Sequence, residues 1–258
     1  MFLKKEEYKA FIATIDLLRK VLPQGSAIEV RNGIIRFRHC AKRFFVEINL
    51  KSIFPNSSFS LSLTHSTSRM LKGLLNADNK ITVVPSYTGF TIADAGTIVP
   101  MMKPEPHRLV QYQPRYEIDN RLQIDYKKPI TTFIIEKESQ RHIKVISNFE
   151  KITHVFVRVN NSYIIIKILN PKDYGGSFLG FSTKIRPEYT IPSDEIFVIN
   201  IGPIINFPPP LKVTIYPSTR PGWWVYKING RISNSPFIDF NVYNSATLNE
   251  KVREFYNL

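Results

Sequence analysis

The chain has 258 residues, of which 43% are hydrophobic, and its formal net charge at pH 7 is +14. This length suits two domains of ordinary size, each with enough apolar side chains to bury a core. The strong positive charge indicates a polyanionic partner, and because Lys and Arg are spread along the chain, it predicts a basic folded surface rather than a disordered basic arm. A generally cationic, soluble protein is the alternative.

The sequence has no feature of a membrane or secreted protein. It contains no run of 18 apolar residues, and residues 1–7 lack the apolar stretch of a signal peptide. We therefore expect a soluble, intracellular protein. The single cysteine, Cys40, can form no internal disulfide and has no second Cys with which to share a zinc ion. We expect no metal and no other cofactor, and interpret Cys40 as a core thiol in a strand.

Residues 5–22 predict an amphipathic helix that stops before Pro23 and Gly25. Apolar side chains recur at spacings of three and four, at Tyr8, Phe11, Ile12, Ile15, Leu18 and Leu22. The opposite, net positive face carries Lys5, Lys9, Ala13, Asp16 and Lys20.

Four strands and a short helix follow. The strands are expected at residues 27–30, 34–37, 44–50 and 59–63, with Asn32-Gly33 forming a tight hairpin turn between the first two. The helix is expected at about residues 66–76, with Arg69 and Lys72 facing away from its apolar stripe. That stripe consists of Met70, Leu71, Leu74 and Leu75.

A seven-residue stretch then occurs twice in the chain. Lys80-Ile-Thr-Val-Val-Pro-Ser86 returns as Lys212-Val-Thr-Ile-Tyr-Pro-Ser218, at an offset of 212 − 80 = 132 residues. In both copies a β-branched run stops at Pro-Ser, turns and resumes after a glycine, which is typical of a hairpin. A repeat at this distance predicts that one fold occurs twice in the chain.

Residues 103–128 lie between the two copies and change character, with three prolines, many polar residues and no sustained period. We interpret them as a linker that crosses the surface between two domains, with short extended pieces at residues 109–112 and 122–126. The order of elements then restarts with a strand at 130–135 and a helix at 137–152. Ile143, Ile146 and Phe149 are its inward side chains, and its outer face shows Lys137, Gln140, Arg141, Lys144, Asn148 and Lys151.

The rest of the second copy follows the first less closely. Strands are expected at 154–159, 163–168 and 196–201, and a Gly-rich stretch at 174–180 is interpreted as a loop because it lacks the Lys-Ser/Thr of a phosphate-binding loop. The second short helix should come next, but the prolines of residues 202–210 allow no more than about one turn. Three closing strands end at Asn244.

No catalytic constellation has the spacing that its chemistry requires. The sequence contains no His-Glu-x-x-His, no Gly-x-Ser-x-Gly, no Walker-type loop and no Cys/His metal pair. The scattered acidic residues fall mostly in turns, where Asp is favoured for backbone reasons. We therefore expect that the protein is not an enzyme.

This order of elements, repeated around an irregular linker and with basic outward helix faces, resembles that of the DNA sliding clamps over nearly the whole chain. With two repeats it is similar to the T4-type phage clamps and to PCNA, whose trimers form rings with helices lining a central channel. The resemblance implies an α+β fold of two tandem clamp-like domains, each with antiparallel sheets and two short helices on one face. The domains are expected at 1–103 and 129–246, with a linker at 104–128 and a C-terminal tail at 247–258.

The function that this resemblance implies is a sequence-independent clamp on double-stranded DNA, acting as a DNA polymerase processivity factor in a phage or large DNA virus. We expect a homo-trimer that contacts the polymerase and a clamp loader or a transcription factor. It would work in the host cytoplasm for a phage, or in the nucleus or viral replication site for a eukaryotic virus. Such a clamp needs Lys and Arg on rigid elements that contact phosphates. The candidate residues are Lys5, Lys9, Lys20, Arg69, Lys72, Lys137, Arg141, Lys144 and Lys151.

The resemblance also implies a hydrophobic pocket beneath the linker that accepts polymerase tail peptides. The candidates for it are Leu109, Val110, Tyr112 and Ile118, whose alternative role is to pin the linker to the sheets. The chain's own tail ends in Phe255-Tyr-Asn-Leu258 and is expected to pack on the second domain or in such a pocket.

Two features depart from the clamp pattern and keep other functions open. The second short helix is weak, and a net charge of +14 is unusual for clamps. Strong positive charge is similar to that of the herpesvirus-type processivity subunits, which hold DNA on one face as open monomers or dimers. A clamp-derived transcription accessory factor would differ only in its partner. A β-rich viral structural protein is the alternative from another class, and a jelly roll would need neither amphipathic helix.

Overall fold

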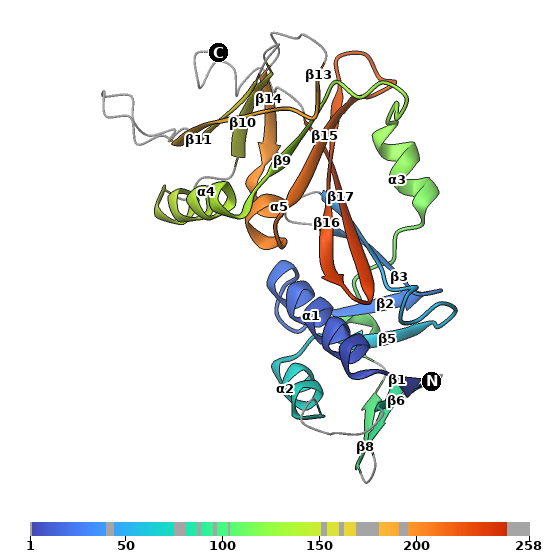
Figure 1. Ribbon diagram of the computed structural model, residues 1–258. Coiled ribbons are helices and arrows are strands. Elements are labelled where there is room, and N and C mark those ends of the chain that lie inside the picture. The colour runs from blue at the N-terminus through green and yellow to red at the C-terminus, as the bar shows by residue number, and fades with distance from the viewer. Residues whose placement is uncertain are drawn as a thin grey trace. The chain divides into compact units, whose positions relative to one another are not determined.

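The computed structural model describes residues 2–39, 44–74, 81–86, 89–94, 97–102, 104–150, 154–159, 163–168, 181–190 and 196–246. The chain forms two compact units (Figure 1). The first comprises Met1–Arg115 with Arg231–Asn241, and the second comprises Tyr116–Gly230 with Val242–Leu258. Both mix helices with antiparallel sheets, so the predicted α+β class is confirmed.

The first unit begins with β1 (Phe2–Leu3) and the long helix α1 (Lys5–Val21). One four-stranded part of a larger sheet has the order β4-β3-β2-β5 and consists of β2 (Ala27–Arg31), β3 (Ile34–His39), β4 (Phe44–Asn49) and β5 (Phe59–Ser62). Helix α2 (His65–Gly73) follows. The other sheet has the order β1-β6-β7-β8 and adds β6 (Ile81–Ser86), β7 (Gly89–Asp94) and β8 (Thr97–Met102).

The second unit uses the same scheme after a connecting segment with η2 (Pro106–Arg108) and α3 (Arg115–Leu122). Strand β9 (Thr131–Ile135) and helix α4 (Lys137–Glu150) begin it. The sheet β12-β11-β10-β14 consists of β10 (His154–Val159), β11 (Ile164–Ile168), β12 (Phe181–Ile185) and β14 (Ile196–Asn200). After helix α5 (Ile201–Asn206), the strands β15 (Leu211–Pro217), β16 (Trp224–Asn234) and β17 (Phe237–Ser245) follow β9 and β13 (Tyr189–Thr190) in the order β13-β9-β15-β16-β17. The end of β16 and the beginning of β17 belong to the first unit.

The pairing of the strands confirms the predicted duplication. Strand β2 pairs with β3 and β5, as β10 pairs with β11 and β14. Strand β6 pairs with β1 and β7, as β15 pairs with β9 and β16. Each unit therefore places a long helix after its first strand and a short helix before its closing hairpins.

The predicted buried face of α1 is confirmed. Tyr8, Phe11, Ile12, Ile15, Leu18 and Leu22 are all buried. The Phe11 ring meets the edge of the Phe54 ring at a centroid distance of 5.1 Å, and Phe54 in turn meets Phe59 at 5.1 Å. Aromatic pairs in this geometry add to the stabilisation from burial, so α1 is a rigid support for whatever its outer face contacts.

Each long helix docks its short helix through a side-chain donor at the same position of the repeat. The hydroxyl of Tyr8 in α1 donates to the carbonyl oxygen of Leu71 in α2 at 2.8 Å. The amide of Gln140 in α4, at an offset of 140 − 8 = 132, donates to the carbonyl oxygens of Ile204 and Phe207 at 2.7 and 2.6 Å. The last carbonyls of a helix have no partner within it, which explains why Gln140 faces inward and why its predicted place on the outer face is wrong.

Replacing Tyr8 by Phe is expected to lower the free energy of unfolding by about 1 kcal/mol, because the Leu71 carbonyl loses its donor while the ring stays packed. Burial raises the pKa of the Tyr8 hydroxyl, which therefore stays a donor. Urea unfolding measures the loss. The control is Tyr116→Phe, since Tyr116 is 64% exposed and should change nothing; equal losses in the two variants would contradict the docking role.

Two local predictions need correction, and several others fall on residues that the structure does not describe. Met70 was expected in the apolar stripe of α2 but is 42% exposed, because the face turned to α1 carries Thr67, Ser68 and Leu71 instead. The extended piece expected at 122–126 begins inside helix α3, where Ile118 and Leu122 are buried at helical spacing. The loop at 174–180 and the tail at 247–258 lie outside the described residues, as do Cys40, Leu75 and Lys151.

Candidate nucleic-acid interface

The outer stripe of α1 lies exposed as the sequence predicts. Lys5, Lys9, Ala13 and Lys20 are exposed, and Asp16 between them is half-buried. The Lys9 ammonium lies 2.9 Å from the Glu6 carboxylate, a pair that is mostly solvent-exposed and contributes little to stability. The stripe is therefore a row of solvated cations on a helix whose other face is fixed in the core.

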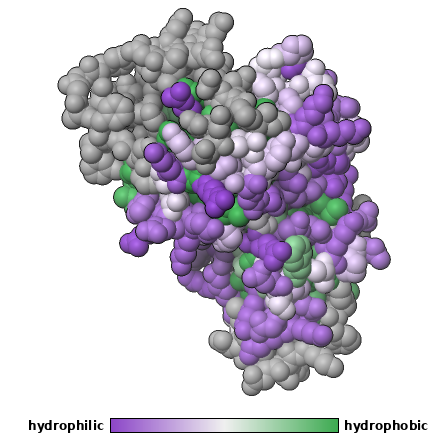
Figure 2. All heavy atoms as spheres, turned by 45° about the horizontal axis from the view of Figure 1, so that its top comes forward, coloured by the Kyte–Doolittle hydropathy of each residue, from purple (hydrophilic) through white to green (hydrophobic). Residues whose placement is uncertain are grey.

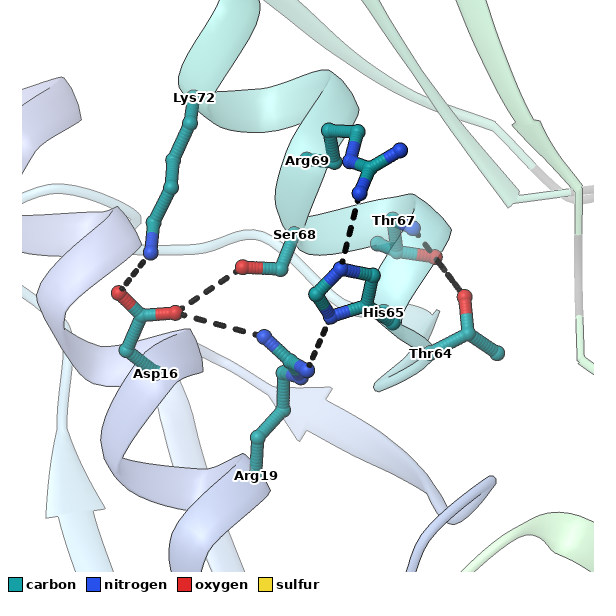
Figure 3. Close-up of polar contacts among 8 residues, drawn as sticks. All are labelled: Asp16, Arg19, Thr64, His65, Thr67, Ser68, Arg69 and Lys72. Atoms are coloured by element: carbon teal, nitrogen blue, oxygen red, sulfur yellow. Dashed lines mark hydrogen bonds and ion pairs between the residues drawn. The ribbon is translucent and has the colours of Figure 1, made fainter.

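The seam between α1 and α2 brings further cations to this surface (Figure 3). Asp16 accepts from the hydroxyl of Ser68 at 3.0 Å and from the ammonium of Lys72 at 2.7 Å. The guanidinium of Arg19 lies 3.7 Å from the same carboxylate. Lys72 therefore leans onto α1 while keeping its side chain half exposed, and the two helices present one continuous charged surface.

A histidine that the sequence reasoning passed over completes the seam. The ring of His65 lies between two arginines, with Nδ1 3.1 Å from Arg19 Nη2 and Nε2 3.4 Å from Arg69 Nη2. We call Asp16, Arg19, His65, Arg69 and Lys72 the seam cluster. Arg19 was also not among the sequence candidates, although its position one residue before Lys20 in the last turn of α1 would have indicated it.

Helix α4 of the second unit carries an equivalent row of cations. Lys137, Arg141 and Lys144 are exposed, as predicted. Lys137 and Arg141 follow Lys5 and Lys9 at offsets of 137 − 5 = 132 and 141 − 9 = 132, the same offset as the duplicated hairpin. Two cationic positions thus recur at equivalent places on the long helix of each unit.

The linker lies along the first unit through backbone and side-chain contacts. The amide of Val110 donates to the carbonyl of Ala27 at 2.8 Å, and the amide of Gln113 donates to the carbonyl of Arg36 at 3.1 Å. The guanidinium of Arg31 lies 4.6 Å from the centre of the Tyr112 ring. These contacts pin the linker to β2 and β3, while a peptide-accepting role stays a prediction. Of the candidates for that role, Leu109, Val110 and Tyr112 are half-buried and Ile118 is fully buried.

The described surface is strongly polar on the face drawn in Figure 2. Hydrophilic side chains cover most of it, and hydrophobic residues show only as small areas between them. Among the described residues, no group of three or more His, Cys, Asp or Glu side chains could hold a metal ion. No helix in the same part of the chain is both long and apolar enough to cross a membrane.

Comparison with known proteins finds similarity of fold, but no match by sequence. No family model matches the sequence, and no curated protein matches it. The fold matches A. fulgidus PCNA bound to the C-terminal region of FEN-1, with a TM-score of 0.60 and 12% identity over 96% of this chain and 98% of that one. A PCNA2–PCNA3 complex from Sulfolobus tokodaii matches with a TM-score of 0.57 and 12% identity, over 94% of this chain and 98% of that one.

A bacterial protein gives a similar match over part of its length. The DNA polymerase III subunit beta of Pseudomonas aeruginosa aligns with a TM-score of 0.57 and 11% identity, over 94% of this chain and 65% of that one. This chain therefore spans about two-thirds of the bacterial protein.

Proposed function

We propose that this chain, which has the sliding-clamp fold, is a non-enzymatic processivity factor that encircles double-stranded DNA and tethers a DNA polymerase in a phage or large DNA virus. The observation that carries the proposal is the recurrence of exposed cations at equivalent positions on α1 and α4. Cations on rigid helices suit phosphate contacts, which hold a duplex without reading its bases. All the candidate DNA residues of the two long helices except Lys151 lie within the described residues.

Two strand edges support assembly of a ring. Within the described residues, β8 ends the sheet β1-β6-β7-β8 of the first unit, and β12 ends the sheet β12-β11-β10-β14 of the second. An unpaired edge is a template for pairing with another chain. Pairing of β8 in one copy with β12 in the next is a head-to-tail contact, which closes into a ring when the rotation permits. A homo-trimer would contain six units.

Polymerase recruitment is proposed for the pinned linker. The A. fulgidus clamp was solved with the C-terminal region of FEN-1, which supports capture of a short peptide by this fold. Leu109, Val110 and Tyr112 are half-buried and available at the linker surface, whereas Ile118 would support such a site from below. A clamp loader or a transcription factor is a further proposed partner. The corresponding location is the host cytoplasm for a phage, and the nucleus or viral replication site for a eukaryotic virus.

The ring proposal is tested by sizing and by DNA topology. Light scattering should give about three times the chain mass of 29.9 kDa. Protein assembled around a nicked circular plasmid should stay on it during gel filtration in high salt, and cutting the plasmid once should release the protein, because an encircling ring can slide off an end. Equal retention on circular and linear DNA by a monomer would instead establish the open type of processivity subunit.

That open subunit is the second candidate, and the net charge of +14 is the observation that favours it. A protein that does not close around DNA must hold the duplex by affinity, and each additional phosphate contact strengthens that hold. The affinity of such a subunit for linear DNA would fall steeply as the salt concentration rises.

A further inference from the structure

The imidazole of His65 has arginine donors at both of its ring nitrogens (Figure 3). A guanidinium group only donates hydrogen bonds, and a neutral imidazole has one nitrogen that accepts and one that donates. Neutral His65 can therefore accept a hydrogen bond from Arg19 or from Arg69, but not from both. When His65 is protonated, both ring nitrogens donate, and neither arginine can bond to the ring.

Among the described residues, the other charged groups of the seam do not offer a replacement acceptor to Arg69. From α1, the seam presents Asp16 and Arg19; from α2, it presents Arg69 and Lys72. Asp16 already accepts from Ser68 and pairs with Lys72, and it lies beside Arg19. The seam cluster thus holds three permanent cations against one carboxylate, and protonation of His65 would add a fourth positive charge.

We infer that protonation of His65 is a switch that controls the affinity of this surface for a polyanion. In its neutral form the ring occupies one guanidinium. In its protonated form the ring releases both arginines and adds its own charge, so that Arg19, Arg69 and the imidazolium converge on one phosphate. The inference rests on the proposed function, because the phosphate in question is that of duplex DNA. Since the bound state favours the proton, DNA affinity should be higher at pH 6 than at pH 8.

The test compares DNA binding of the full chain at pH 8 and pH 6. Fluorescence anisotropy with a 30-base-pair duplex, at several salt concentrations, should show affinity about tenfold higher at pH 6 and a salt slope steeper by about one to two units. In His65→Gln the side chain keeps an acceptor but cannot titrate, so most of this pH dependence should be lost.

Two other histidines provide matched controls. His107 is exposed beside Glu105, at 3.4 Å from its carboxylate, and His142 is exposed on α4. His107→Gln and His142→Gln should keep the full pH dependence. Loss of the pH dependence in His142→Gln, or its persistence in His65→Gln, would contradict the assignment of the switch to His65.

A second polyanion separates this inference from the proposed function. Heparin is titrated in parallel with the duplex. If heparin binding depends on His65 and pH while duplex DNA does not bind, the seam cluster is a polyanion site and the clamp function is wrong. If duplex DNA binds without any effect of His65, the clamp function stands and the switch is wrong. Binding of neither polyanion would overturn both.

Discussion

Replacing Lys5, Lys9, Lys137 and Arg141 by glutamine is expected to weaken binding to duplex DNA by about three and a half orders of magnitude at 0.1 M salt. Each phosphate contact contributes about 0.9 to the slope of log K against log salt, so losing one costs about eightfold at this salt concentration. Four losses multiply, and the slope should fall by about four units. Because phosphate contacts are independent of sequence, the loss should be the same for duplexes of different sequence.

A second quadruple variant controls for total charge. Lys51, Lys127, Lys128 and Arg186 are exposed and lie outside the helices. Replacing them by glutamine leaves the same net charge of 14 − 4 = +10, yet should cost much less affinity. Thermal melting checks that both variants fold. If the two variants weaken DNA binding equally, the affinity follows net charge alone, and the helix rows are not the DNA-contacting surface.

Gly33→Ala is expected to destabilise the first unit by about 3 to 5 kcal/mol or to prevent its folding. Gly33 has a φ of +70°, and a Cβ built on it would lie 2.1 Å from the carbonyl oxygen of Phe54. Two backbone hydrogen bonds hold this close approach. The Gly33 amide donates to the Ser57 carbonyl at 3.0 Å, and the Gly33 carbonyl accepts from the Leu50 amide at 2.7 Å. The added methyl must displace the turn that carries the Phe54 ring, on which Phe11 of α1 packs.

Gly222→Ala separates the two parts of this effect. Gly222 has a similar φ of +74°, but nothing lies within 4 Å of its added Cβ. The free energy of unfolding of this variant should fall only by the cost of placing alanine in the left-handed region, about 1 kcal/mol. Urea unfolding of both variants gives the comparison. Similar losses would mean that the Phe54 turn moves aside easily, and that the close approach contributes nothing to the stability of the first unit.

The glycine turn and the helix rows could be predicted from the sequence because their causes are local. Asn-Gly between apolar strands is the strongest short-range signal of a hairpin turn, and Asn32 and Gly33 both have the positive φ that such a turn requires. The spacing of Tyr8, Phe11 and Ile15 sets the buried face of α1 and therefore the exposure of Lys5 and Lys9 opposite. The duplicated hairpin in turn predicted that the order of elements repeats.

Other features depended on which groups the tertiary structure brings together. Gln140 is polar and lies at a position that the helical pattern places toward solvent. Its amide instead points inward and donates to carbonyls in α5 and directly after it, more than 60 residues away. The spacing of apolar residues by three and four along a helix cannot show this, because it contains no information about unpaired acceptors on another element.

The seam cluster is the clearest case of a feature that only the tertiary structure brings together. By sequence alone, Arg19 is one more cation near the end of α1, and His65 is an isolated histidine before α2. They are 46 residues apart, and only the packing of α2 against α1 places the ring between two guanidinium groups. Composition determined that this protein is basic, and local periodicity determined on which helices its charges stand. The tertiary structure alone decided which charges share an acceptor, because hydrogen bonds require a distance that no one-dimensional pattern specifies.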